Sequence, residues 1–222
     1  SRRRHPTNVP AAPLAAARQR PPHPQQLRSQ QPVAVSDREV SAPNHFYVLL
    51  LDHTTMKTYN ILFLCTGNSA RSVMSEALAT TMSNGRFIGY SAGSHPTGKI
   101  NPFAIEMIAP TGYDTSTLRS KSWDEFALPN APQMDFIITV CDNAAGETCP
   151  FWPGNPATAH WGYEDPAAVE GSDEAKRASF QKVFQQIATR MRTFCSLPIE
   201  SLDALAIKHE IAAIGSTPVA SP

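Results

Sequence analysis

Short apolar runs alternate with helix-like stretches from residue 59 onward, and this alternation constrains the fold more than any other feature of the chain. The runs are each short enough to be a buried strand, and they cover 60–64, 86–93, 135–141 and 157–161. Apolar residues fall at helical spacing over 69–82, 101–110 and 173–194. Strands that alternate with helices predict an α/β fold with a central four-stranded parallel sheet and helices on both faces.

Local signals mark the ends of two predicted helices. The second helix is predicted to begin at Asn101, and Pro110 stops it. Ser172 is a predicted cap of the longest helix, and Asp173 and Glu174 follow at the positive end of its dipole. We therefore expect the longest helix to begin at Asp173.

The N-terminal quarter of the chain has a different composition from the rest. Residues 1–44 hold eight of the 20 prolines, and residues 1–55 hold seven arginines and no lysine. Such a segment buries too little apolar surface to offset the entropy lost on ordering. We expect 1–56 to be a disordered extension, or translated sequence upstream of a start at Met56; the alternatives are a transit peptide and a nucleic-acid-binding tail. The domain is predicted over 57–197, followed by a C-terminal tail over 198–222.

Charge and hydropathy narrow the class of protein. The formal net charge is zero, which gives no general basis for binding nucleic acid. No apolar run approaches the roughly 20 residues of a membrane span, and no secretory signal pattern stands at the N-terminus. We expect a soluble, cytoplasmic monomer without a nucleic-acid or membrane partner, in which the cysteines are reduced at rest.

A thiol and a guanidinium flank a short loop between the first strand and the first helix. Cys65 ends the strand, and Arg71 stands six positions later. A loop that enters a helix N-terminus can turn its N–H groups inward around an anion, and Arg71 can bind two oxygens of a tetrahedral oxyanion. The predicted oxyanion-binding residues are Thr66, Gly67, Asn68, Ser69, Ala70, Arg71 and Ser72.

The same loop can activate its cysteine. The positive field of the loop and helix favours the thiolate of Cys65, and the Ser72 hydroxyl can donate to the sulfur. Asn68 is expected to brace the loop through side-chain hydrogen bonds. The alternative is that Cys65 is a small apolar side chain buried at a strand end.

Two further cysteines follow the third predicted strand. Cys141 ends that strand, so it is expected at the same sheet edge as Cys65. Cys149 lies eight positions later, too far for a zinc pair with about 2–4 intervening residues, and Gly146 indicates a mobile loop between the two thiols, as a thiol relay needs. The alternatives are a core residue for Cys141 and an incidental loop thiol for Cys149. We expect Cys195, just past the longest helix, to be structural.

The sequence "CTGNSARS" followed by "MSEAL" resembles the low-molecular-weight protein tyrosine phosphatase superfamily. Within it, the chain is most similar to the bacterial arsenate reductases that are regenerated through thioredoxin. The resemblance runs from about 59 to 194 and includes "YSAGSHPTGKINPFAIEMI" and "VCDNAAGETCPFWPGNPATAHWGYEDPA". Tyrosine phosphatases share the loop and the late Asp-Pro, but not typically the second cysteine pair.

The resemblance implies a mechanism. Cys65 attacks arsenate while Asp165, in "EDPA", protonates the leaving oxygen. Cys141 then attacks Cys65 and releases arsenite, and Cys149 attacks Cys141. An external dithiol system, either thioredoxin or glutathione with glutaredoxin, reduces the resulting disulfide, and no bound cofactor or metal is implied.

The sequence therefore predicts an arsenate reductase of arsenic detoxification. The first alternative is a tyrosine phosphatase that hydrolyses phosphate esters with Cys65, Arg71 and Asp165 alone. The second is a non-catalytic module that binds oxyanions and regulates a partner. The second thiol pair separates the reductase from the phosphatase, and catalytic turnover separates both from the module.

Overall fold

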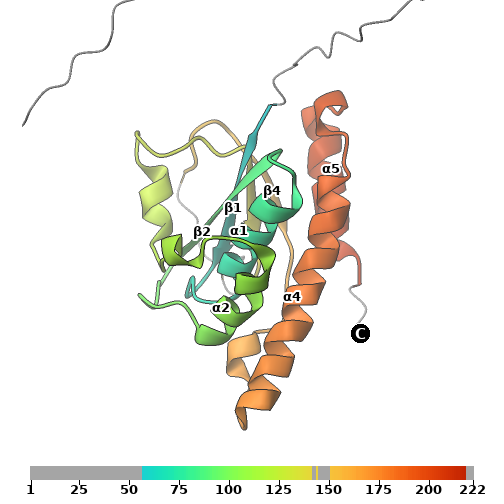
Figure 1. The fold of residues 1–222 in the computed structure, drawn as a ribbon. Helices are drawn as coiled ribbons and strands as arrows, with labels where there is room; N and C mark the ends of the chain where they lie inside the picture. The colour runs from blue at the N-terminus through green and yellow to red at the C-terminus, as the bar shows by residue number, and fades with distance from the viewer. Residues whose placement is uncertain (1–56, 142–143, 145–150, 219–222) are drawn as a thin grey trace, which may run out of the picture. The chain divides into compact units, whose positions relative to one another are not determined.

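A parallel sheet of four strands lies at the centre of the residues that the computed structural model describes, which are 57–141, 144 and 151–218 (Figure 1). The strands are β1 (Tyr59–Cys65), β2 (Phe87–Gly93), β3 (Phe136–Thr139) and β4 (Ala157–His160). Their order is β2-β1-β3-β4, and each neighbouring pair is parallel. The predicted sheet is confirmed. The predicted extension 1–56 and Cys149 lie outside the described residues.

Helices connect and follow these strands. The α-helices of the described part are α1 (Arg71–Met82), α2 (Pro102–Ile108), α4 (Asp173–Cys195) and α5 (Ala204–Ser216). Short 3-10 helices are η1 (Ala109–Thr111), η2 (Thr115–Thr117), η3 (Trp123–Ala127), η4 (Pro166–Ala168) and η5 (Ile199–Ser201). No described helix is long and apolar enough to cross a membrane.

The predicted cap at Ser172 forms, and the structure adds a second cap at Asn101. The Asn101 side chain accepts a hydrogen bond from the N–H of Phe103 at 3.0 Å, and the Ser172 side chain accepts one from Ala175 at 3.3 Å. Each cap pairs an N–H group that the first helical turn leaves without a partner inside the helix. The longest helix therefore begins at Asp173, as its sequence predicts.

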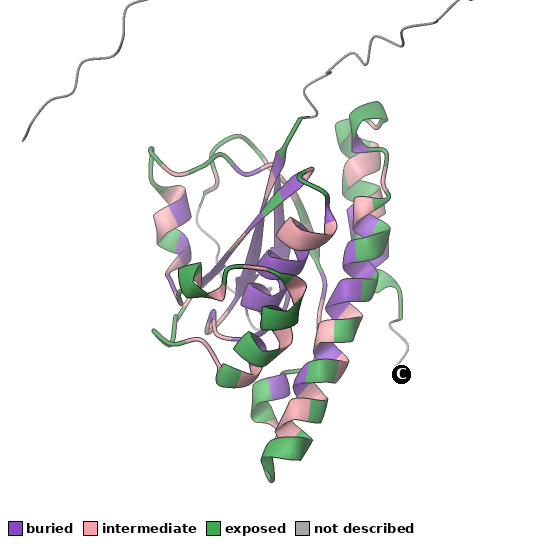
Figure 2. Ribbon diagram, in the orientation of Figure 1, coloured by how far each residue is buried: buried purple, intermediate pink, exposed green. Residues whose placement is uncertain are grey.

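Both faces of the sheet are buried, and β1 shows why. Ile61 and Phe63 point into the larger core, which α1, α2, α4 and α5 cover, whereas Leu62 and Leu64 point into a smaller core beside η3. All four side chains are fully buried (Figure 2). A parallel strand enclosed on both faces reads as a continuous apolar run, which is the pattern of 60–64.

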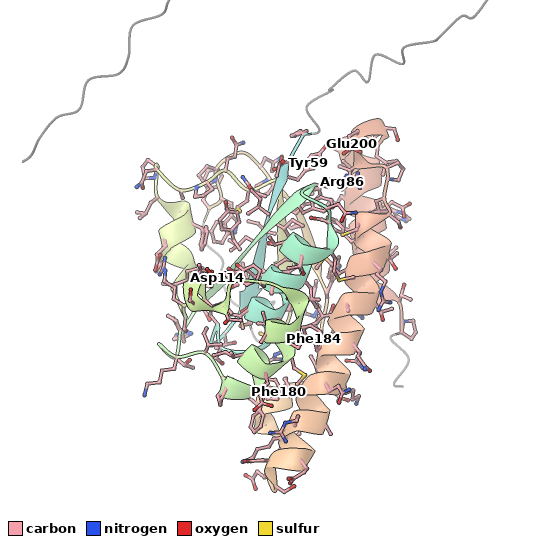
Figure 3. The ribbon with its side chains drawn as sticks, in the orientation of Figure 1. Tyr59, Arg86, Asp114, Phe180, Phe184 and Glu200 are labelled. Atoms are coloured by element: carbon pink, nitrogen blue, oxygen red, sulfur yellow. The ribbon has the colours of Figure 1, made fainter. Side chains whose placement is uncertain are left out.

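Aromatic rings join α4 to the sheet and to α2. The ring centroid of Phe194 lies 4.8 Å from that of Phe87 and 5.3 Å from that of Phe136. About three to four turns before the C-terminal end of α4, Phe180 and Phe184 pack against the larger core, and the ring centroid of Phe180 lies 5.7 Å from that of Phe103 on α2 (Figure 3). These contacts explain the helical apolar spacing that runs through the whole of 173–194.

Arg86 fastens the amino end of β2 to the segment after α4. Its guanidinium donates to the carbonyl oxygens of Cys195 at 2.9 Å and Leu197 at 2.7 Å. It also donates to both carboxylate oxygens of Glu200, at 3.0 and 2.7 Å (Figure 3). Cys195 therefore lies at the amino ends of the strands, partly buried against the larger core, and Cys65 lies at the carboxyl end of β1.

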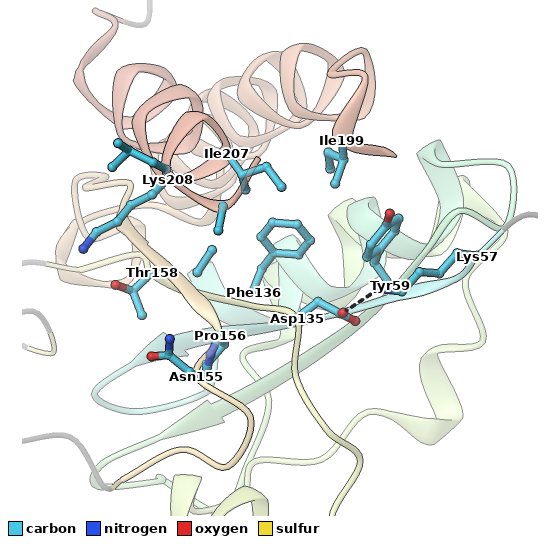
Figure 4. Close-up of a pocket in the computed structure, with 13 residues that line it drawn as sticks. Lys57, Tyr59, Asp135, Phe136, Asn155, Pro156, Thr158, Ile199, Ile207 and Lys208 are labelled. Carbon is cyan, nitrogen blue, oxygen red and sulfur yellow. Dashed lines mark hydrogen bonds and ion pairs between the residues drawn. The ribbon is translucent and has the colours of Figure 1, made fainter. Parts of the chain in front are cut away.

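A cavity of about 590 Å³ opens at the same amino ends of the strands (Figure 4). Tyr59, Phe136 and Ile207 form apolar parts of its wall, and Lys57 and Asp135 form an ion pair of 3.4 Å at its rim. Leu205 also lines this cavity. Ligands of open parallel sheets bind beyond the carboxyl ends of the strands, so this cavity is at the opposite edge from the predicted site.

Helix α5 lies within 198–222, the segment that the sequence predicts to be a C-terminal tail. Ile211 and Ile214 of α5 are buried in the larger core, and the Trp161 indole donates to the carbonyl oxygen of Ile211 at 2.9 Å. The signal for the helix was present in the sequence. Ile207, Ile211 and Ile214 stand at helical spacing, and Asp203 caps the helix by accepting from the N–H of Ala206 at 2.8 Å.

Ile211→Ala tests whether α5 is part of the cooperative domain. Because Ile211 is fully buried, we expect this variant to lower the free energy of unfolding by about 2–5 kcal/mol. Leu205→Ala, in the same helix at a side chain that is 78% exposed, is the matched control and should stay within about 0.5 kcal/mol of the wild type. Urea denaturation measures both, and equal effects would contradict the packing of α5.

Candidate active site

Backbone hydrogen bonds to the carbonyl oxygens of the loop between β1 and α1 fix the conformation of this loop. The oxygens of Cys65, Thr66, Gly67 and Ser69 accept, in that order, from the backbone N–H groups of Ser94, His95, Thr97 and Asn101 at 2.9–3.2 Å. The C=O and N–H of one trans peptide unit point in opposite directions, so the N–H groups that follow these carbonyls face the interior of the loop. One of them, that of Asn68, donates to the Cys65 sulfur at 3.1 Å. The loop therefore has the inward N–H groups that an oxyanion site requires.

Cys65 lies at the start of this loop and is only 4% exposed. The Ser72 hydroxyl is 2.9 Å from its sulfur, as the sequence predicted. Burial raises the pKa of the Cys65 thiol; the hydrogen bond with Ser72 lowers it, Cys141 adds to the increase, and the Asn68 N–H lowers it again. The expectation that the loop favours the thiolate is wrong in its net direction, because burial of the thiol outweighs its hydrogen bonds.

Asn68 braces the loop, as predicted. Its side-chain amide donates to the hydroxyl oxygens of Ser72 at 3.0 Å and Ser91 at 2.8 Å. Its side-chain oxygen accepts from the backbone N–H of Lys121 at 2.8 Å. These bonds hold Asn68 in a left-handed backbone conformation, with φ of 43°, which asparagine tolerates better than most residues.

A buried ion pair lies behind Asn68, and the sequence did not indicate it. The Glu76 carboxylate on α1 accepts hydrogen bonds from the hydroxyls of Ser91 and Tyr113, the latter at 2.8 Å, and lies 3.6 Å from the Lys121 ammonium. Burial lowers the pKa of Lys121, against the attraction of Glu76, and burial and Glu76 both raise the pKa of Tyr113. The available signal was Glu76 itself, an acidic residue among the apolar residues of α1.

Arg71 and Asp165 are distant in sequence and adjacent in the structure. The Arg71 guanidinium lies 3.0 Å from the Asp165 carboxylate and also donates to the carbonyl oxygen of Tyr163 at 3.1 Å. The other carboxylate oxygen of Asp165 caps η4 by accepting from the N–H of Ala167 at 3.1 Å. The fold thus holds this carboxylate at the mouth of the Cys65 loop.

Cys141 lies beside the loop as well. Val140 donates its N–H to the carbonyl oxygen of Leu64 at 2.8 Å, which aligns the end of β3 with the end of β1. The Cys141 sulfur is 3.7 Å from the Thr66 hydroxyl and is only 2% exposed. Two of the three thiols of the predicted relay are therefore neighbours, and the third, Cys149, lies outside the described residues.

The described residues contain no group of three or more His, Cys, Asp and Glu side chains that could hold a metal ion. The chemistry that the assembled groups can perform is attack by a thiol on an oxyanion held by backbone N–H groups and a guanidinium. A carboxylate stands close enough to handle a proton, and a second thiol lies beside the first.

The chain resembles known proteins in sequence and in structure. The sequence model of the low molecular weight phosphotyrosine protein phosphatase family matches residues 60–207. An arsenate reductase of Halalkalibacterium halodurans is 40% identical over 134 residues, which are 60% of this chain and 93% of the relative. An arsenate reductase of Bacillus subtilis is 39% identical over 139 residues, which are 63% of this chain and 96% of the relative. Among solved structures, an arsenate reductase from Archaeoglobus fulgidus has 26% identity and a TM-score of 0.49, and the match covers 62% of this chain and 99% of that one.

Ser72→Ala tests the electrostatics of the thiol. Because the hydrogen bond with Ser72 lowers the pKa of Cys65, its loss should raise that pKa further and shift the alkylation of Cys65 to higher pH. The measurement is the pH dependence of iodoacetamide modification, with mass spectrometry of the Cys65 peptide. Ser75→Ala is the matched control, since Ser75 is a buried serine of the same helix that donates to the backbone oxygen of Arg71 at 2.8 Å. Equal profiles in the two variants would contradict the assigned role of Ser72.

Lys121→Met tests the buried ion pair. It leaves the Glu76 carboxylate without its cation, and we expect the free energy of unfolding to fall by about 3–5 kcal/mol. Adding Glu76→Gln should restore part of that loss, because the uncompensated charge is removed. Lys57→Met, which breaks the exposed pair with Asp135, is the control and should cost at most about 1 kcal/mol. A double variant that is no more stable than Lys121→Met would show that the two groups are not coupled.

Proposed function

We propose that this chain, which belongs to the low molecular weight phosphotyrosine protein phosphatase family and matches its sequence model over 60–207, reduces arsenate to arsenite. The two relatives at 40% and 39% identity bear the name arsenate reductase, and this chain covers 93% and 96% of their lengths. The single observation that carries the proposal is the Cys141 thiol beside the Cys65 loop. Hydrolysis of a phosphate ester needs Cys65, Arg71 and Asp165, but it has no use for a second thiol at that place.

The first step takes place in the loop. Arsenate binds to the inward N–H groups and displaces Asp165 from the guanidinium of Arg71. The Cys65 thiol gives its proton to the Asp165 carboxylate, and the resulting thiolate attacks arsenic and forms a sulfur–arsenic bond. Asp165 passes the proton to a hydroxyl oxygen of arsenate, and the bond between arsenic and that oxygen breaks to release water. Arsenic is still in its pentavalent state, and the loop and Arg71 neutralise the charge that develops on its oxygens.

The second step moves two electrons. The Cys141 thiolate attacks the sulfur of Cys65, a disulfide forms, and the electron pair of the sulfur–arsenic bond stays on arsenic, which leaves as arsenite. Burial of both sulfurs favours this attack over hydrolysis, because water has little access to the Cys65 adduct. Cys149 then attacks Cys141, which frees Cys65 and leaves a Cys141–Cys149 disulfide.

The third step needs an external dithiol. A carrier of the thioredoxin type attacks the Cys141–Cys149 disulfide, becomes oxidised and returns both cysteines to thiols. Such a cycle belongs in a reducing compartment, and we propose the cytoplasm. Cys195 takes no part, since it lies beside Arg86 at the other edge of the sheet.

Cysteine variants test the relay. Cys141→Ser and Cys149→Ser should each reduce multiple-turnover arsenate reduction with thioredoxin to background, because the electrons have no path from Cys65 to the carrier. Both should retain hydrolysis of an aryl phosphate, which needs only the first thiol, whereas Cys65→Ser should lose both activities. Cys195→Ser is the control and should behave as the wild type.

Three results would decide against the proposal. If Cys141→Ser and Cys149→Ser still turn over arsenate with thioredoxin, the relay is wrong. If the wild type hydrolyses the ester but does not reduce arsenate, the protein is a phosphatase. If it does neither, it is a non-catalytic oxyanion-binding module.

A further inference from the structure

Residues 162–164 lead from β4 to Asp165, and they belong to no helix or strand of the described structure. Side-chain cations bind each of these three residues instead. The contacts are those of Arg190 with the carbonyl oxygen of Gly162 at 3.0 Å, of Arg71 with the carbonyl oxygen of Tyr163 at 3.1 Å, and of Lys182 with the carboxylate of Glu164 at 2.7 Å. The place of Asp165 therefore depends on contacts from α4 and α1.

The contact of Arg190 differs from the other two. The ion pair of Lys182 with Glu164 is solvent-exposed, with side chains that are 35% and 75% exposed, and such surface pairs contribute little. The Arg71 guanidinium has to bind the oxyanion in the proposed reaction, so it cannot also serve as a fixed point for the segment. Arg190 is only 8% exposed and does not contact the oxyanion loop through any bond described above, so its contact is available at every step.

The guanidinium of Arg190 is itself fixed by the carboxyl end of α5. It donates to the carbonyl oxygens of Gly215 at 2.9 Å and Thr217 at 3.2 Å. The last carbonyl groups of a helix lack partners inside the helix and carry partial negative charge, which suits a cation. The carbon at the centre of the guanidinium also lies 4.7 Å from the centroid of the Tyr163 ring. Three carbonyl groups and one ring thus hold the planar guanidinium in a single orientation.

Helix α5 is held firmly against the end of β4. A side-chain carbon at Gly215 would overlap the carbonyl oxygen of His160, so the helix packs directly on the backbone there. The Trp161 indole binds the carbonyl oxygen of Ile211, as described above. A role as a cap of α5 would account for the contacts of Arg190 with the helix end, but not for its contact with Gly162. That contact links the fixed end of α5 to the segment that leads to Asp165.

We propose that Arg190 is a positioning residue, which holds 162–164 so that the Asp165 carboxylate can move a proton at the oxyanion site. It acts through the backbone of Gly162 and Tyr163 and does not touch the substrate. This role rests on the proposed function, since Asp165 has a proton to move only when Cys65 attacks an oxyanion. It adds to that function a buried cation of α4, with α5 as its support.

Hydrolysis of two aryl phosphates by the full chain tests this role, because the need for a proton donor depends on the leaving group. Phenolate is a poor leaving group and needs a proton from Asp165, whereas dinitrophenolate leaves without one. The quantity measured is the kcat/KM for dinitrophenyl phosphate divided by that for phenyl phosphate, in which the deprotonation of Cys65 cancels. Arg190→Met should raise this ratio by about tenfold or more, because a displaced acid no longer reaches the leaving oxygen.

Two further variants show whether the effect passes through Asp165. Asp165→Asn should raise the ratio at least as much, and adding Arg190→Met to it should change the ratio no further, since the two residues act as one unit. Arg86→Met is the matched control. Arg86 also donates to two backbone carbonyl oxygens, but at the opposite edge of the sheet, so its loss should leave the ratio at the wild-type value.

Arg190→Lys keeps the test decisive if Arg190→Met does not fold, as judged by circular dichroism. Lysine retains the charge but lacks the planar fork that reaches several carbonyl groups at once. The ratio should therefore rise in Arg190→Lys as well, but by less than in Arg190→Met.

Several results would overturn the role of Arg190. These are a wild-type ratio in the folded Arg190 variants, a further rise when Arg190→Met is added to Asp165→Asn, and an equal rise in Arg86→Met. If the wild type hydrolyses both esters but reduces no arsenate, the proposed function fails, and the ratio still decides on Arg190. If the wild type has neither activity, both proposals fail.

Discussion

The hydrogen bonds from 94–101 to the carbonyl oxygens of the Cys65 loop are the constraint on which the site depends. The local sequence of a loop between a strand and a helix does not by itself direct several N–H groups toward one point. Here the backbone after β2 binds the carbonyls on the outside, and planar trans peptides then fix the opposite direction for the N–H groups. Gly93 permits this contact, because a side-chain carbon at that position would overlap the carbonyl oxygen of Thr66. The pairing of β1 with β2 and the shape of the oxyanion site are thus one structural requirement.

A polar chain extends this requirement into the core. Cys65, Ser72, Asn68, Ser91 and Glu76 are linked in that order by hydrogen bonds, and Lys121 closes the chain twice, through its ammonium to Glu76 and through its backbone N–H to Asn68. Burying a carboxylate and an ammonium is costly, and replacing such a pair with apolar residues often preserves or improves stability. We therefore interpret the pair as fixing the orientation of Asn68, and with it the conformation of the loop, rather than as adding to the stability of the fold.

The sequence predicted what depends on neighbours along the chain and missed what depends on packing. Strands, the larger helices and the loop follow from local periodicity, and the positions of Cys65 and Cys141 follow from the rule that parallel strands end at one sheet edge. The Glu76–Lys121 pair joins α1 to a loop far along the chain, so no local pattern reveals it. The raised pKa of Cys65 was missed for a related reason, because the depth of burial of a thiol is set by everything packed around it. Helix α5 is different, since its capped and periodic pattern was present in the segment interpreted as a tail.

Burial of Cys65 and Cys141 keeps both sulfurs out of contact with another protein. Both cysteines belong to the larger core, together with the apolar residues of α1. A thiol that must meet a charged oxyanion needs N–H donors and a guanidinium, and a thiol that must meet a protein needs exposed apolar surface. One cysteine cannot have both environments. The proposed relay resolves this conflict, because it lets Cys65 stay enclosed with arsenate while the electrons enter through another cysteine. The proposed reaction therefore needs at least two thiols, one for each environment.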